Sequence, residues 1–290
     1  MHPIRKSLTS LLLAMSICAC GGSGAGQVSP GGPPPMAPSA QPNVSLLAAP
    51  LDMPGLNRQR QIRLYLPPDY ATSGKRYPVL YMHDGQNLFD AATSYAGEWE
   101  VDETMNALSK AGQLDLIVVG VDNGGAKRMT ELDPWDNPTY GKAEGEQYME
   151  FVVKVVKPLI DATYRTLPER ANTGVMGSSM GGFISHYAIE RYPEVFSKAG
   201  LFSPSYWVND TQMFDLVTSH PAPKDTRIYM LMGGSEGGPM VPDAQRMASL
   251  LKQSGHPEAN LTLKITPGGT HSETFWRGEF RQAVLWMFAK

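Results

Sequence analysis

A serine bracketed by glycines constrains the fold more than any other feature of this chain. The sequence Gly-Ser-Ser-Met-Gly-Gly at residues 177–182 follows an apolar run at residues 173–176 and precedes a helix-like segment at residues 183–191. A sharp turn from a strand into a helix strains the backbone of its central residue, and glycines on either side avoid collisions with neighbouring elements. The motif therefore predicts that Ser179 is lifted out of a sheet, with the next backbone N–H aimed at the same small volume.

The remaining chain alternates between apolar strand-like runs and segments with helical spacing. This order predicts a mostly parallel, doubly wound α/β sheet, in which ligands bind at the carboxyl ends of the strands. The expected strands cover residues 60–66, 79–82, 116–121, 173–176, 198–202, 227–232 and 261–265, and the expected helices cover residues 99–110, 146–162, 183–191, 243–254 and 274–288.

The first residues have the features of an export signal. Arg5 and Lys6 precede an apolar stretch at residues 8–19 that is too short to span a bilayer. Ala19 stands directly before Cys20, which resembles a bacterial lipobox and predicts a lipoprotein signal peptide at residues 1–19 with lipidation of Cys20. The alternative is an ordinary secretory signal with incidental cysteines. In the lipoprotein case the protein is exported, lipid-anchored in the cell envelope, and has no disulfide, because no further cysteine remains.

Composition divides the rest of the chain into two parts. Residues 20–43 are rich in Gly, Pro, Ser and Ala, which predicts a flexible tether after the anchor. Residues 44–290 then form one catalytic domain, a usual size for an α/β fold. The formal net charge is −3, so nothing favours a nucleic-acid partner.

A serine needs a base to act as a nucleophile, and in this fold the order is serine, acid, histidine. His271 follows the last expected strand through a short Pro-Gly-Gly-Thr loop, which predicts that it is the base. Glu236 lies in a glycine-rich loop after the strand at residues 227–232 and is the expected partner of the imidazole. Asp243, a few residues later, is the alternative acid.

The loop after the strand at residues 79–82 is the expected source of an oxyanion donor. The N–H groups of Gln86 and Met180 would stabilise a developing negative charge. A metal site built from His83, Asn87 and neighbouring aspartates is the weaker alternative, because the spacing lacks a tight ligand cluster. We therefore expect no metal and no cofactor.

Several motifs carry a resemblance to a known family. The run Leu-Tyr-Met-His-Asp-Gly-Gln-Asn-Leu-Phe-Asp at residues 80–90 is similar to a signature of the esterase D-like, putative-esterase branch of the α/β-hydrolases. Shorter matches include residues 97–99, 119–124, 203–207 and 269–273, and the resemblance covers about residues 44–290. It implies an α/β-hydrolase fold and a serine hydrolase with Ser179, Glu236 and His271 as its triad. Many members use aspartate as the acid, which is the one departure at Glu236.

Four further residues are the expected substrate contacts. Asp84 lies in the turn that the resemblance assigns to the oxyanion donor, and Trp135 and Trp207 lie in loops on the presumed active face. Each tryptophan either stacks on a sugar or aromatic acyl group or pins its loop to the core. Arg128 is expected to pair with Glu131 and so order the long loop, with substrate contact as its second role.

These observations predict an exported serine esterase that acts on a small-molecule or glycan ester. The expected substrate is a carbohydrate-linked acyl group or a siderophore-like polyester. The alternatives are a broad carboxylesterase for short acyl chains, an enzyme that passes the acyl group to a sugar instead of water, and a surface binding protein without turnover.

Overall fold

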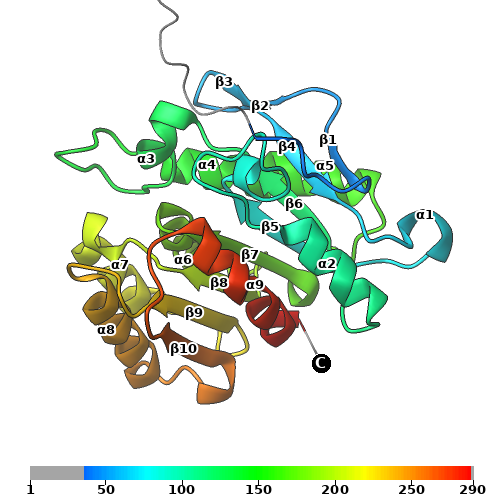
Figure 1. Cartoon of the computed structure of the whole chain (residues 1–290). Helices are drawn as coiled ribbons and strands as arrows, with labels where there is room; N and C mark the ends of the chain where they lie inside the picture. Colours follow the sequence, from blue (N-terminus) through cyan, green and yellow to red (C-terminus); the bar gives the residue numbers. More distant parts are fainter. Residues whose placement is uncertain (1–35, 289–290) are drawn as a thin grey trace, which may run out of the picture. The chain divides into compact units, whose positions relative to one another are not determined.

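The computed structural model describes residues 36–288, which belong to one compact unit, Met36–Lys290. Eight strands form its central sheet in the order β1-β4-β6-β5-β7-β8-β9-β10, and β2 pairs with β3 in a separate hairpin (Figure 1). The strands are β1 (Val44–Leu46), β2 (Leu51–Met53), β3 (Arg58–Arg60), β4 (Ile62–Tyr65), β5 (Val79–His83), β6 (Ile117–Val121), β7 (Thr173–Ser178), β8 (Lys198–Phe202), β9 (Arg227–Gly233) and β10 (Leu261–Thr266).

The sheet is parallel from β6 through β10, and β1 and β4 run antiparallel at its other edge. Every residue of β5, β6 and β7 is buried, as continuously apolar strands covered on both faces require. The register of β5 with β7 pairs Met82 with Met176, so both strands end at the same edge of the sheet. The mostly parallel α/β sheet that the sequence predicts is confirmed.

Helices cover both faces of the sheet (Figure 1). The α2 and α9 helices pack on one face with Trp99, Met105 and Phe280 in the core, and the α4 to α8 helices pack on the other. The helices are α1 (Tyr70–Ser73), α2 (Val101–Lys110), α3 (Arg128–Glu131), α4 (Gly145–Phe151), α5 (Lys157–Thr163), α6 (Met180–Arg191), α7 (Asp210–Ser219), α8 (Met240–Gln253) and α9 (Glu273–Phe288).

Several parts of the fold differ from the expectation. The single helix predicted at residues 146–162 is interrupted by a π-helical stretch, Val152–Val156, between α4 and α5. The α7 helix and the β2–β3 hairpin were not predicted. Residues 36–43, placed in the tether by composition, instead contact the domain: Ser39 donates from its backbone N–H to Asp90, and Gln41 donates to Asp102. The composition of residues 36–43 could not predict these contacts, because the acceptor residues lie more than fifty positions away in the sequence.

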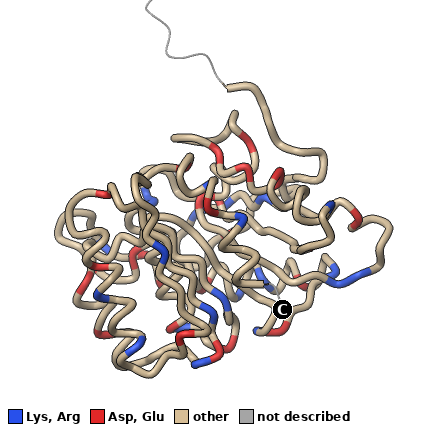
Figure 2. Tube along the Cα trace, turned by 60° about the horizontal axis from the view of Figure 1, so that its bottom comes forward, with Lys and Arg blue, Asp and Glu red and all other residues tan. Residues whose placement is uncertain are grey.

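The predicted signal peptide, the lipidated Cys20 and most of the tether lie outside the described residues. Within residues 36–288, no helix is both long and apolar enough to cross a membrane. Figure 2 shows acidic and basic residues interspersed along the trace.

Candidate active site

Ser179 lies in the strained turn that the motif predicted. It joins β7 to α6 with φ 58° and ψ −120°, angles that a residue other than glycine rarely adopts. A Cβ atom on Gly177 would lie 2.7 Å from the carbonyl carbon of Gly181, and one on Gly181 would lie 3.3 Å from both Oδ2 of Asp84 and Cβ of His83. The two glycines are therefore required for the close approach of β7, α6 and the loop after β5.

Glu236 and His271 meet from the loops that follow β9 and β10. The Nδ1 atom of His271 lies 2.8 Å from Oε2 of Glu236. The other carboxylate oxygen accepts from the hydroxyl of Ser203 at 2.5 Å and from the N–H of Gly233 at 2.9 Å, and the indole N–H of Trp276 donates to Ser203 Oγ at 2.9 Å. Burial favours a raised pKa for Glu236, but the hydrogen bonds from His271, Ser203 and Gly233 outweigh it and lower the pKa. Glu236 is thus held as a carboxylate that orients the imidazole.

Asp243, the alternative acid, lies elsewhere. It belongs to the first turn of α8 and sits 3.6 Å from Arg246 on the same helix. Asp243 therefore contacts a residue of its own helix, and Glu236 is the acid that the fold brings to His271.

A cavity of about 660 Å³ brings the predicted residues together. Ser179 and His271 both line it, together with Asp84, Gln86 and Arg128. The hydroxyl of Ser179 lies 3.1 Å from that of Ser205 in this state. The cavity is further lined by Asn87, Tyr95, Ala96, Asn123, Gly125, Ala126, Ser178, Glu273 and Trp276.

The two expected oxyanion donors lie at helix starts. Gln86 is in a short 3₁₀ helix, Gly85–Asn87, directly after β5, and its side-chain oxygen accepts from the N–H of Asn123 at 3.1 Å. Met180 is the first residue of α6, where backbone N–H groups have no acceptor within the helix. The side chain of Met180 is buried in the core, so only its N–H is available for a ligand.

Asp84 and Arg128 form a buried ion pair in the cavity wall. The guanidinium donates from Nε to Oδ1 at 2.6 Å and from Nη2 to Oδ2 at 2.8 Å, and Asn123 Nδ2 donates to Oδ1 at 2.6 Å. Burial favours a raised pKa for Asp84, but the charge and hydrogen bonds of Arg128 outweigh it and lower the pKa. Both residues line the cavity, and their charges compensate each other.

The expected pairing of Arg128 with Glu131 is wrong. Glu131 is fully buried and accepts from Arg58 at 2.7 Å and from Arg60 at 2.5 Å, both from β3. The sequence did not predict the β2–β3 hairpin that carries these arginines. Their ion pairs with Glu131 could therefore not be predicted either.

Trp135 and Trp207, the other predicted substrate contacts, do not line the cavity at Ser179. Trp135 packs edge-on against Phe183 and Tyr187, which pins its loop to α6. Trp207 is 45% exposed and lies against Tyr140. The aromatic residues that line the cavity are Tyr95 and Trp276, which the sequence did not single out.

The residues of the alternative metal site each have another partner. His83 Nδ1 lies 2.7 Å from the hydroxyl of Tyr148, and burial lowers the pKa of His83 to about 4, so its ring is neutral at pH 7. Asp84 is bound by Arg128, and Asn87 accepts from the N–H of Tyr95. These contacts stabilise the loop after β5, which favours a structural role for the three residues over metal binding.

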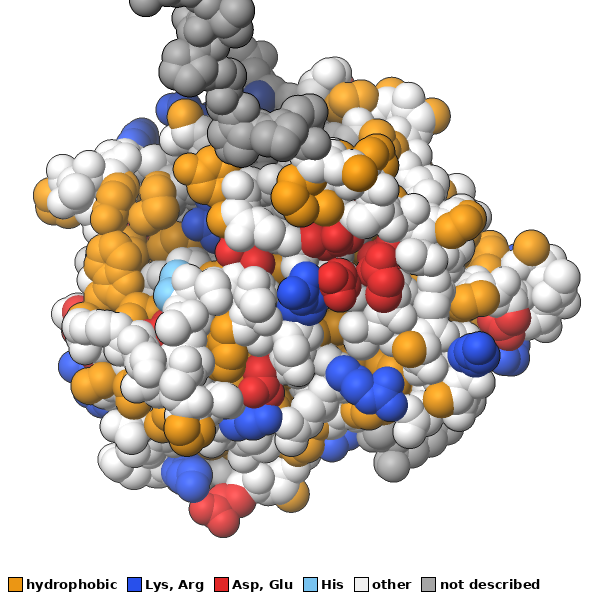
Figure 3. All heavy atoms as spheres, in the orientation of Figure 1, with side chains coloured by type: hydrophobic (Ala, Val, Ile, Leu, Met, Phe, Trp, Pro, Cys, Tyr) orange, Lys and Arg blue, Asp and Glu red, His pale blue; other side chains and the backbone are white. Residues whose placement is uncertain are grey.

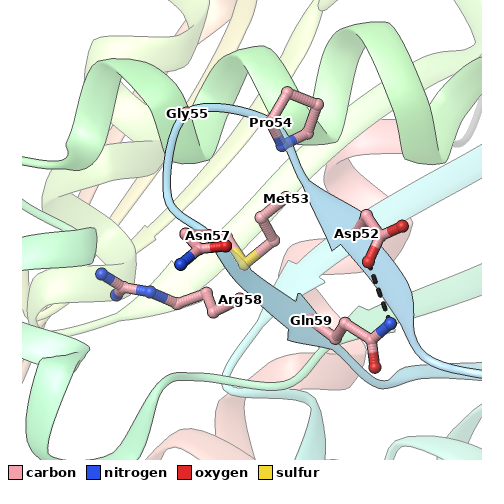
Figure 4. A pocket seen from close by; sticks show the side chains of 7 residues that line it. All are labelled: Asp52, Met53, Pro54, Gly55, Asn57, Arg58 and Gln59. Atoms are coloured by element: carbon pink, nitrogen blue, oxygen red, sulfur yellow. Dashed lines mark hydrogen bonds between the residues drawn. The ribbon is translucent and has the colours of Figure 1, made fainter.

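A second hollow, of about 510 Å³, lies on the β2–β3 hairpin (Figure 4). Its wall comes from this one hairpin, and Asp52 and Gln59 are hydrogen-bonded to each other at 2.9 Å. The side chain of Arg58 extends away from that pair and binds Glu131 and Glu144. The side chains of Asp52, Arg58 and Gln59 thus already have protein partners, and the candidate site is the cavity at Ser179.

The fold and this site define the protein as an α/β-hydrolase. Residues 54–287 match the model of the family described as "Putative esterase", so the chain belongs to that family and is an ester hydrolase, as the signature at residues 80–90 predicted.

The chain is similar to several known proteins. "Uncharacterized protein YbbA" of Bacillus subtilis is 28% identical over 244 residues, which are 80% of this chain and 93% of that protein. An "Endo-1,4-beta-xylanase/feruloyl esterase" of Xylanibacter ruminicola is 25% identical over 225 residues, 76% of this chain but only 28% of that protein. The solved structure of "Siderophore hydrolase EstA" from Aspergillus nidulans has the same fold, with a TM-score of 0.69 and 17% identity over 85% of this chain and 95% of that one.

Proposed function

We propose that the protein hydrolyses carboxylic esters through an acyl-enzyme on Ser179. The observation that carries this proposal is the hydrogen bond from His271 Nδ1 to Glu236, made by a histidine that shares its cavity with Ser179. A carboxylate on Nδ1 fixes the tautomer in which Nε2 accepts a proton, and it stabilises the imidazolium that results.

In this mechanism Ser179 Oγ attacks the ester carbonyl while His271 takes its proton. The oxygen of the tetrahedral intermediate is stabilised by the N–H groups of Met180 and Gln86, and the protonated His271 then gives its proton to the leaving alcohol. A water molecule, activated by the same histidine, releases the acid. Before substrate arrives, the Ser179 hydroxyl is near Ser205, and contacts of this kind commonly rearrange in the Michaelis complex.

We propose a carbohydrate-linked acyl ester or a siderophore-like polyester as the substrate. Support comes from the relative named a feruloyl esterase and from the structural neighbour named a siderophore hydrolase. A cavity of about 660 Å³ is in the size range of sites for organic molecules larger than a short acyl chain. Tyr95 and Trp276 in its wall offer surfaces for an aromatic acyl group.

A fluorophosphonate probe tests the nucleophile. The wild type is expected to be labelled, Ser179→Ala to lose the label, and Ser205→Ala, which alters only the neighbouring hydroxyl, to keep it. Absence of labelling on the folded wild type would favour a binding protein on the same fold.

A panel of esters tests the substrate class: p-nitrophenyl esters, feruloylated or acetylated xylan, and ferric enterobactin. The release of free acid from each ester separates the proposed substrates from those of a short-chain carboxylesterase. Acyl-sugar products would indicate acyl transfer.

We further propose that the enzyme is exported and anchored in the cell envelope by lipid on Cys20. This rests on the sequence Ile-Cys-Ala-Cys-Gly at residues 17–21. Palmitate labelling in a bacterial host is expected to depend on Cys20, and a Cys20→Ser chain that is still labelled and still sediments with membranes would argue against it.

A further inference from the structure

Three acidic side chains converge where the chain enters α2. Carboxylate oxygens of Glu98, Asp102 and Glu103 lie within 4.8 Å of one another. Asp102 is fully buried and Glu98 is 7% exposed, while Glu103 is half-buried. Figure 3 shows acidic side chains gathered beside a basic one in the middle of the face in view. Ionised carboxylates this close together, and shielded from water, repel one another strongly.

Each of the three carboxylates accepts a hydrogen bond on one oxygen only. Glu98 Oε2 accepts from Ser39 Oγ at 2.7 Å, Asp102 Oδ2 from the N–H of Gln41 at 2.8 Å, and Glu103 Oε1 from Gln41 Nε2 at 3.1 Å. The other oxygens, Oε1 of Glu98, Oδ1 of Asp102 and Oε2 of Glu103, are buried and accept from no N–H or hydroxyl group of the described residues. Leaving buried oxygens unsatisfied is costly, so this group of three requires either a proton shared between Asp102 and Glu103 or a bound cation.

The charges that act on this cluster are acidic. Burial raises the pKa of Glu98, and the carboxylates of Glu103, Glu100 and Asp90 raise it further. Burial, a side-chain hydrogen bond with Glu103 and the charge of Glu103 together raise the pKa of Asp102 to about 8, so without a cation the two carboxyl groups share a proton at pH 7. Nearby Glu100 is itself paired with Arg277 at 2.7 Å, so that arginine already has a partner outside the cluster.

We propose that Glu98, Asp102 and Glu103 form a binding site for a divalent cation, with calcium as the best fit. Calcium prefers carboxylate oxygens at about 2.3–2.6 Å, so ligands on opposite sides of the ion lie up to roughly 5 Å apart. The 4.8 Å spread of these oxygens matches that span. Magnesium has shorter bonds and retains water, and zinc prefers nitrogen or sulfur ligands, so both suit the cluster less well.

The ion would also fix the N-terminal segment, residues 36–43, to the domain. Ser39 and Gln41 donate to the same three carboxylates, and Ser39 Oγ also accepts from the N–H of Ala91. Neutralising the cluster keeps these acceptors ionised and in place. The site therefore couples cation binding to the ordering of the segment that leads into the domain, independently of the hydrolytic site.

Calorimetry with calcium chloride at pH 8, on the full chain after treatment with EGTA and desalting, tests the proposal. We expect one calcium per chain and a rise of several degrees in the unfolding temperature at saturation.

Terbium should compete with calcium for the site. Its luminescence should be excited through Trp99, which is buried and adjacent in sequence to Glu98. The double variant Asp102→Asn/Glu103→Gln should bind calcium at least tenfold more weakly and lose the thermal shift. The matched control is Glu150→Gln on α4, whose carboxylate pairs only with exposed Lys154 in an i,i+4 contact.

Two results would overturn the proposal: no stoichiometric calcium binding by the wild type, or unchanged binding by the double variant. Removing two crowded charges should make the calcium-free variant at least as stable as the calcium-free wild type. If the double variant does not fold, Glu103→Gln alone serves the same comparison, because that side chain is only half-buried.

Discussion

The Nδ1 atom of His271 lies 2.8 Å from Oε2 of Glu236, although 35 positions separate the two residues. The contact forms because the loops after β9 and β10 leave neighbouring parallel strands at the same edge of the sheet. Ser203 and Gly233 hold the other oxygen of the carboxylate, so the acid cannot turn away without losing two further hydrogen bonds.

Ser179→Ala is expected to lower kcat/KM for p-nitrophenyl acetate by about 10³-fold or more, because the acyl-enzyme can no longer form. Ser205→Ala, which removes the hydroxyl 3.1 Å away, should retain activity within about tenfold. Equal losses in both variants would contradict the assignment of Ser179 as the nucleophile. Steady-state kinetics on folded protein, checked by circular dichroism, make the comparison.

Glu236→Gln is expected to lower kcat by about 10²–10⁴-fold, because an amide no longer stabilises the imidazolium of His271. Asp243→Asn is the matched control on the following helix and should leave kcat within about twofold, since its carboxylate contacts Arg246. The assignment of the acid would be reversed if Asp243→Asn were the more damaging change.

Asp84→Asn should reduce the free energy of unfolding at pH 7 by about 2–4 kcal/mol, because it leaves the guanidinium of Arg128 without its charged partner. The folded-state pKa of Asp84 is lowered relative to the unfolded value of about 3.9. Its contribution is therefore complete above that pH and is lost as the pH falls toward the folded-state pKa. Urea unfolding between pH 3 and pH 7 should show a shallower acid-side loss in Asp84→Asn than in the wild type, and parallel curves would contradict this account.

Gly177→Ala and Gly278→Ala should have opposite effects on stability. A Cβ at position 177 would meet the backbone of Gly181 at 2.7 Å, so we expect a loss of more than about 2 kcal/mol together with activity. A Cβ at position 278 meets nothing within 4 Å on the exposed side of α9, so we expect a gain of about 0.5–1 kcal/mol. The unfolding temperatures of the two variants test this prediction. A Gly177→Ala variant as stable as the wild type would show that the turn at Ser179 is less tightly packed than the structure indicates.

Tyr95→Ala and Trp207→Ala compare two exposed aromatic residues, only one of which lines the cavity. An aromatic contact with substrate contributes about 0.5–1.5 kcal/mol, so Tyr95→Ala should raise KM for a feruloyl ester by about 2- to 12-fold. Trp207→Ala should leave KM unchanged, and acetyl esters should not distinguish either variant from the wild type. A larger effect from Trp207→Ala would restore that residue as a substrate contact.

The sequence predicted the parts of the site that depend on local geometry and strand order. The Gly-x-Ser-x-Gly sequence limits the backbone angles of its own turn. The loops of Glu236 and His271 could be placed beside each other because parallel strands end at the same edge of the sheet. The predicted sheet and the esterase family were confirmed in this way.

Contacts between distant segments could not be predicted in the same way. Whether Arg128 pairs with Asp84 or Glu131 depends on two arginines of an unpredicted hairpin. The loops of Trp135 and Trp207 were placed on the correct side of the sheet, but the direction of each ring is set by packing against α6 or Tyr140. Residues 36–43 have a composition typical of linkers, and the acidic groups that bind them are distant in sequence.

The indole of Trp276 supports Ser203, which in turn supports Glu236, so the last helix helps to hold the acid loop. A chain still emerging from the ribosome therefore contains the Ser179 turn well before it contains the imidazole and the helix that complete the arrangement. Esterase activity should consequently appear late in biosynthesis, after α9 has docked on the sheet, and nascent chains stalled before residue 271 should be inert toward esters.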